Sequence, residues 1–111
     1  MATAIEDAVR QHVECFNEAV RTGVWAAFAA RFADDGVLTF TNVPVGPFVG
    51  REAIRQAYDA RPPDDTMTVL GVQADGPDAA IVRFRWDAGA DGTMLLRWRD
   101  GLLIELVVTF D

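Results

Sequence analysis

The sequence predicts an α+β domain in which three helices pack against one face of a curved antiparallel sheet. Apolar residues recur at spacings of three and four in three segments of the N-terminal half, which is the pattern of amphipathic helices. Alternating residues fill most of the C-terminal half and are interrupted by short Gly, Asp and Pro turns, as in a meander of strands. With 111 residues, the chain is expected to form a single domain over residues 1–111.

The first and third helices are predicted from apolar stripes and from residues that start or stop a helix. Residues 3–21 carry one stripe of five residues, namely Ile5, Val9, His12, Phe16 and Ala19. A shorter helix over residues 51–60 follows Gly50. The pair Pro62-Pro63 ends it, because proline lacks the amide N–H and restricts the residue before it.

The second helix is expected to begin at Thr22, a suitable N-cap, and to extend to about residue 33. Three aromatic residues at helical spacing form its buried side, namely Trp25, Phe28 and Phe32. Asp34, Asp35 and Gly36 are then expected to end the helix.

Five strands are expected, over residues 37–41, 66–74, 79–88, 92–99 and 102–110. Residues 42–47 contain two prolines and a glycine, so this segment is predicted to be a turn. Asp100-Gly101 predicts a tight hairpin turn between the last two strands.

Alternation in the last strands assigns their faces. The face expected to meet the helices contains Met94, Leu96, Trp98, Ile104, Leu106, Val108 and Phe110. The opposite face contains Leu103 and Val107, and it gains Phe84 and Trp86 if these point the same way. A sheet that is apolar on both faces is often covered by a second subunit, so a homodimer through the sheet is expected.

Composition argues against several classes of function. The formal net charge of −7 disfavours binding to nucleic acid or to an anionic membrane surface. The single cysteine cannot form an internal disulfide, and the acidic N-terminus does not resemble a signal peptide, so a soluble cytoplasmic protein is expected. One histidine does not make a metal site, and no phosphate-binding or dinucleotide motif is present, so no cofactor is expected.

The order of these elements, with Phe32-Ala33-Asp34-Asp35 at the end of the second helix, resembles the nuclear-transport-factor-2-like superfamily. This superfamily includes ketosteroid isomerases, SnoaL-like polyketide cyclases and the limonene-epoxide-hydrolase type. The resemblance covers nearly the whole chain and implies a cone-shaped, cystatin-like fold with a small-molecule pocket. It implies the fold more strongly than the activity, because this scaffold hosts many chemistries. The expected pocket residues are Trp25, Phe28, Phe40, Tyr58, Met94, Leu96, Trp98, Val108 and Phe110.

The ketosteroid isomerases use a carboxylate base together with a phenol and a protonated acid that hold the enolate oxygen. In this sequence the position of the base holds Phe40, the position of the acid falls near Met94, and the phenol position falls on His12. Steroid isomerisation by that mechanism is therefore not expected.

Residues 40–54, FTNVPVGPFVGREAI, are similar to the segment of limonene-type epoxide hydrolases that runs aromatic-x-Asn, Pro turn, Gly-Arg-acid-Ala-aliphatic. Arg85-Trp86-Asp87 is similar to that family's Arg-x-Asp. The resemblance implies that Asn42 holds a water molecule, that Arg85 orients the epoxide, and that Asp87 is the acid. Two positions depart from the pattern, because Phe40 replaces a tyrosine and Val108 replaces the second aspartate.

The candidate catalytic residues are therefore Asp87, Arg85, Asn42 and His12. Each also has a structural interpretation: a solvated ion pair for Arg85 and Asp87, a turn residue for Asn42, and a neutral core histidine for His12.

These residues lead to the hypothesis of a protein that binds a small apolar or weakly polar molecule. The same hypothesis includes the possibility of an enzyme that performs acid–base or epoxide chemistry on this molecule without a cofactor. The alternatives are a non-catalytic ligand-binding or dimeric interaction module that has lost its base, and a polyketide-cyclase-like enzyme.

Overall fold

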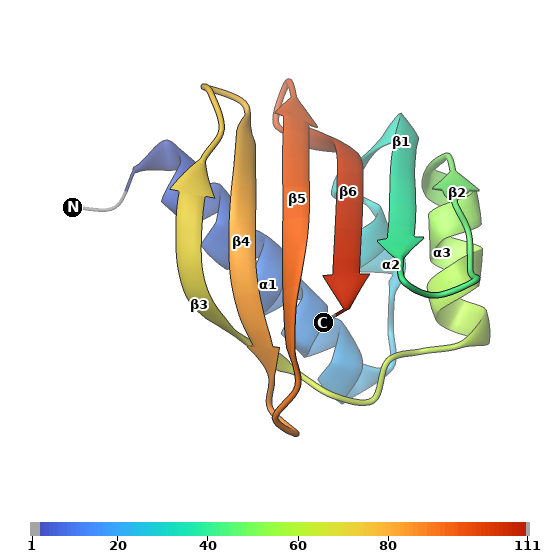
Figure 1. Cartoon of the computed structure of the whole chain (residues 1–111). Helices are drawn as coiled ribbons and strands as arrows, with labels where there is room; N and C mark the ends of the chain where they lie inside the picture. Colours follow the sequence, from blue (N-terminus) through green and yellow to red (C-terminus); the bar gives the residue numbers. More distant parts are fainter. Residues whose placement is uncertain (1–2, 111) are drawn as a thin grey trace.

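The computed structural model describes residues 3–110. The elements follow one another along the chain as α1 (Ala4–Thr22), α2 (Ala26–Ala29), β1 (Phe32–Thr41), β2 (Phe48–Val49), α3 (Arg51–Ala60), β3 (Met67–Ala74), β4 (Ala79–Trp86), β5 (Asp91–Arg99) and β6 (Leu102–Phe110). The six strands form one sheet in the order β2-β1-β6-β5-β4-β3, and the helices cover one of its faces (Figure 1). The α+β class predicted from the sequence is confirmed.

The sheet is mixed rather than wholly antiparallel, because β1 and β6 pair in parallel. The other neighbours pair antiparallel. A parallel pair needs a long crossover, and the chain between β1 and β6 contains α3 and the whole β3–β5 meander. Sequence alternation within single strands does not reveal this non-local pairing.

The second helix is much shorter than predicted. Gly23 adopts a left-handed conformation with φ 76° and ends α1 directly after Thr22, so Thr22 is not the N-cap of α2. Phe32 already pairs with Leu103, and a register shift between Phe32 and Val37 places the expected helix stop inside β1. Trp25, Phe28 and Phe32 are nevertheless all buried, because one helical turn followed by a strand also satisfies their spacing.

The structure decides the face of β4, which the sequence left open, and the face at the start of β6 differs from the prediction. Phe84 is fully buried and Trp86 lines the interior, so both point toward the helices and not to the outer face. A register shift beside Trp98 brings Leu103 opposite it, and Leu103 is buried in place of Ile104. The outer face keeps one apolar row of paired residues, namely Ile81, Leu95 and Val107. A homodimer through this face stays a prediction.

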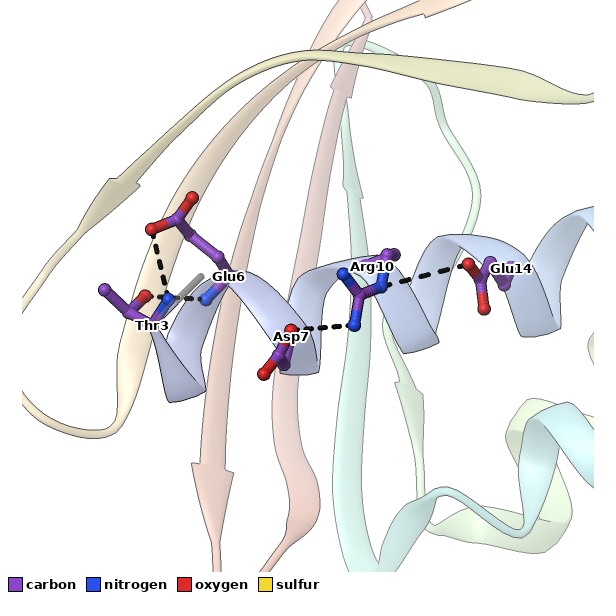
Figure 2. A network of polar contacts seen from close by, with 5 residues as sticks. All are labelled: Thr3, Glu6, Asp7, Arg10 and Glu14. Carbon is purple, nitrogen blue, oxygen red and sulfur yellow. Dashed lines mark hydrogen bonds and ion pairs between the residues drawn. The ribbon is translucent and has the colours of Figure 1, made fainter. Parts of the chain in front are cut away.

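Helix α1 is fixed at its start and at its middle. Thr3 and Glu6 form a capping box, in which each side chain accepts a hydrogen bond from the other residue's backbone N–H (Figure 2). Figure 2 also shows the ion pairs of Arg10 with Asp7 and Glu14, one turn further on. The Asn17 amide donates to the carbonyl of Met67 and accepts from its N–H, both at 2.9 Å. These two bonds fix α1 against β3 and so position its apolar stripe.

None of the helices within residues 3–110 combines the length and apolar character that a bilayer crossing requires.

Candidate functional site

A cavity of about 910 Å³ lies between the inner face of the sheet, α1 and α3. Seven aromatic residues contribute to its wall, namely Phe16, Phe28, Phe40, Phe48, Tyr58, Trp86 and Phe110. Three of these rings follow one another across the sheet: Trp86 stacks on Phe110 at 6.4 Å, and Phe110 stacks on Phe40 at 6.0 Å between ring centroids. The interior of the site is therefore mainly an aromatic surface.

The rim of the cavity is formed by three connections, which lie at the same end of the sheet in Figure 1. They are the β1–β2 loop with residues 43–46, the α3–β3 connection with residues 61 and 63–65, and the β4–β5 turn with Ala88 and Ala90. The charged residues of the cavity wall, Arg61, Asp64 and Asp65, all belong to this rim. Asp65 accepts a hydrogen bond from the Ala88 N–H at 2.9 Å, which joins two of the connections.

His12 is the polar residue of α1 that reaches the cavity. Its side chain is only 2 % exposed and its ring lies 5.4 Å from that of Phe28. Burial and, to a lesser extent, the positive charge of Arg31 lower the pKa of His12 from 6.5 to about 3. Its Nδ1 atom is buried without a hydrogen-bond partner. At neutral pH the cavity wall therefore includes an uncharged imidazole.

Tyr58 of α3 supplies the second polar group of the interior. Its ring stacks on Trp25 with a centroid separation of 4.6 Å, and its side chain is 6 % exposed. Burial raises the pKa of Tyr58 above its ordinary value, because the phenolate is poorly solvated there. The phenol stays protonated, so Tyr58 adds an uncharged polar side chain to the cavity wall.

The structure does not bring the four candidate catalytic residues together. Arg85 lies on the outer face, where its guanidinium pairs with Asp91 at 2.6 Å. Asp87 is exposed beyond the end of β4 and accepts hydrogen bonds from Thr66 and Thr68. Because alternation sends Phe84 and Trp86 inward, Arg85 and Asp87 must face away from the cavity.

Asn42 is also outside the cavity wall. It follows β1 in a left-handed conformation with φ 69°, and its amide donates to the Phe110 carbonyl at 2.8 Å. This bond holds the end of β1 to the end of β6. Of the four candidates, only His12 lines the cavity.

Six of the nine expected pocket residues line the cavity: Phe28, Phe40, Tyr58, Met94, Val108 and Phe110. Trp25 lies behind Tyr58, Leu96 is fully buried in the core, and Trp98 lies toward the other end of β5. The prediction missed several wall residues, among them Phe48, Phe16 and Trp86. Phe16 could have been found four residues after His12 on the same stripe, and Trp86 two residues after Phe84 on the same strand face.

The carboxylates of the two enzyme types described above are missing from the cavity interior. The resemblance places the isomerase base at Phe40, the isomerase acid near Met94 and the second hydrolase aspartate at Val108, and these three apolar residues all line the wall. The carboxylates that do line it, Asp64 and Asp65, lie at the rim. Residues 3–110 also contain no group of three or more His, Cys, Asp or Glu residues that could hold a metal ion.

Comparison with known proteins supports the fold. A family model described as a SnoaL-like domain matches residues 9–106. A protein from Sphaerobacter thermophilus superposes with a TM-score of 0.75 at 21% identity, covering 100% of this chain and 98% of that one.

A protein with a cystatin-like fold from Methylobium petroleophilum gives 0.72 at 16% identity, covering 94% and 76%. A protein with a ketosteroid isomerase-like fold from Catenulispora acidiphila, solved in complex with trimethylamine, gives 0.71 at 18% identity, covering 90% and 85%. At these identities the similarity shows the fold alone. No curated protein matches the sequence.

Proposed function

Since this chain belongs to the SnoaL-like domain family, we propose that it binds a small and largely apolar molecule in the cavity between the sheet, α1 and α3. One observation carries the proposal: a cavity with a mainly aromatic wall that also includes the buried, uncharged ring of His12. Ligand pockets of this size are mostly apolar with a few polar groups that orient the ligand.

The aromatic wall supplies the binding energy in this proposal. Each 100 Å² of apolar ligand surface removed from water contributes about 2.5 kcal/mol. Part of this gain offsets the loss of ligand motion on binding. A ligand that fills only the inner part of the cavity can therefore bind with useful affinity without any ion pair. The exposed charges of the rim would then affect entry more than affinity.

Binding is supported better than proton-transfer chemistry. A general base works best with a pKa near the working pH, and His12, with its pKa lowered to about 3, holds a proton poorly. No carboxylate lines the cavity interior of the described chain. The epoxide-type hypothesis loses its geometric basis because Arg85, Asp87 and Asn42 lie outside the cavity wall.

A screen of apolar compounds, followed by the change in tryptophan fluorescence and by thermal shift, tests the proposal, because Trp86 lies in the wall. Phe48→Ala should weaken binding of any hit, since Phe48 lines the cavity. Val49→Ala is the matched control, because Val49 is 67% exposed and is not part of the wall. If Val49→Ala weakens binding as much as Phe48→Ala, or if no apolar compound binds, the proposal is wrong.

Mass spectrometry of each bound compound after incubation separates binding from turnover. The proposal expects unchanged compounds. Asp87→Asn and Arg85→Gln should leave ligand affinity unaltered, because both side chains are exposed outside the wall. Conversion of an epoxide that Asp87→Asn abolishes would instead restore the hydrolase hypothesis and contradict the placement of Asp87.

A further inference from the structure

We infer that His12 carries its ring proton on Nε2 and donates it to an uncharged acceptor oxygen of the ligand, such as a ketone, ester or ether oxygen. The inference depends on the proposed function, because it assigns the polar end of the same ligand. It makes His12 the residue that selects for an acceptor group.

The first step is to establish which ring nitrogen can meet a ligand. Nδ1 of His12 is fully buried and has no partner. Within residues 3–110, the only other buried side-chain nitrogen or oxygen without a hydrogen-bond partner is Trp25 Nε1. Nε2 of His12 is therefore not both buried and unpartnered. The ring of His12 lines the cavity while its Nδ1 is buried away from solvent, which leaves Nε2 as the nitrogen that can open onto the cavity.

The second step places the proton. A neutral imidazole has one N–H donor and one acceptor nitrogen. With the proton on Nδ1, a buried N–H would have no acceptor, which native structures generally avoid. With the proton on Nε2, the N–H meets the cavity, where a ligand or water oxygen can accept it. The surroundings of the ring therefore favour the Nε2–H form.

The third step is the charge of the ligand's buried end. His12 remains neutral at physiological pH because burial and Arg31 both disfavour its protonation. The Tyr58 phenol is neutral as well, and the charged wall residues belong to the rim. Arg31 acts on His12 from outside the cavity wall, so an anion placed beside His12 would lose its hydration without gaining a direct ion-pair partner there. An uncharged oxygen can accept from His12, while the rest of the ligand contacts aromatic rings.

The tautomer can be measured directly on the unaltered protein. His12 is the only histidine of the chain, so ¹⁵N–¹H correlation spectra of the imidazole contain one ring system. The expected result is the neutral Nε2–H form at pH 7. A neutral Nδ1–H form, or a protonated ring, would overturn the inference whatever the binding experiments show.

Three probes with one skeleton test the ligand class: 2-adamantanone, 2-methyleneadamantane and adamantane-2-carboxylate. The ketone should bind about tenfold more tightly than the methylene compound, which has nearly its shape but no acceptor. The carboxylate should bind most weakly. The ketone signal should also be accompanied by a shift of the His12 Nε2 resonance.

Variants of His12 separate donation from packing. His12→Leu should remove the preference for the ketone, and His12→Gln, whose amide can donate from near the Nε2 position, should retain part of it. Equal binding of ketone and methylene compound to the unaltered protein would refute the inference while leaving the proposed function intact. If neither binds, the proposed function fails and the inference fails with it.

Discussion

Lowering the pH from 7 to 5 is expected to destabilise the folded chain through His12. The pKa of this residue falls from 6.5 to about 3 on folding. Between these values the unfolded chain binds more protons than the folded chain. The stabilisation is therefore present above the unfolded pKa and is lost as the pH falls. A pH of 5 lies about 1.5 units below the pKa of the unfolded histidine. This difference corresponds to a loss of about 2 kcal/mol in the free energy of unfolding.

Urea unfolding followed by tryptophan fluorescence, at pH 7 and pH 5, measures this loss. His12→Leu is the reference, because it cannot titrate and shares the other ionisable groups. Hydrogen bonds from arginines lower the pKa of Asp35 and Asp91, so their contributions are lost only at more acidic pH. The natural chain should lose about 2 kcal/mol more than the variant, or about 1 M in urea midpoint. Equal losses in the two chains would show that His12 is not buried as a neutral ring.

Three further substitutions test the packing that supports the cavity. Thr3→Ala should remove the capping box of α1 and cost about 1 kcal/mol in urea unfolding, and no change would contradict the cap. Asn17→Ala should lower the free energy of unfolding by about 1–3 kcal/mol and speed amide exchange at the start of β3, because two partly buried hydrogen bonds to Met67 are lost. Gly92→Ala should cost about 1–3 kcal/mol, since its Cβ would lie 2.5 Å from a buried ring of β4. Gly71→Ala is the control, with no atom within 4 Å of its Cβ, and an equal loss there would refute the steric reasoning.

Short sequence motifs were sufficient to predict the elements whose ends are marked by glycine, proline or a turn dipeptide. The third helix covers Arg51–Ala60 as predicted, between Gly50 and the proline pair. The last hairpin turns at Asp100 and Gly101, whose φ values of 53° and 81° are those of a tight hairpin turn. In both cases a few neighbouring residues restrict the backbone strongly enough to specify the result.

Elements that depend on distant partners could not be predicted in the same way. The start of β1 is set by the pairing of Phe32 with Leu103, which lies far away in the sequence. The two-residue strand β2 exists because Phe48 and Val49 pair with β1 after the Pro-rich loop. The same limit applies to the rim, where the contact of Asp65 with Ala88 joins segments that no local pattern connects.

The placement of Arg85 and Asp87 depended on a single ambiguity, namely which face of the sheet the alternate residues of β4 occupy. One phase places Arg85 and Asp87 in the cavity, and the other places Phe84 and Trp86 there. Burying the two charged groups would cost several kcal/mol for each ion unless their geometry compensated for the lost hydration. In the structure, Arg85 instead pairs with exposed Asp91, and Phe84 occupies the space left by Gly92, which has no side chain. The glycine opposite Phe84 is a sequence signal for this phase, because a residue without a Cβ leaves room for the Phe84 ring on the inner face. The same choice that removes the charged residues from the cavity leaves His12 and Tyr58 as the polar residues of its inner wall, and the proposed recognition of an uncharged ligand depends on this arrangement.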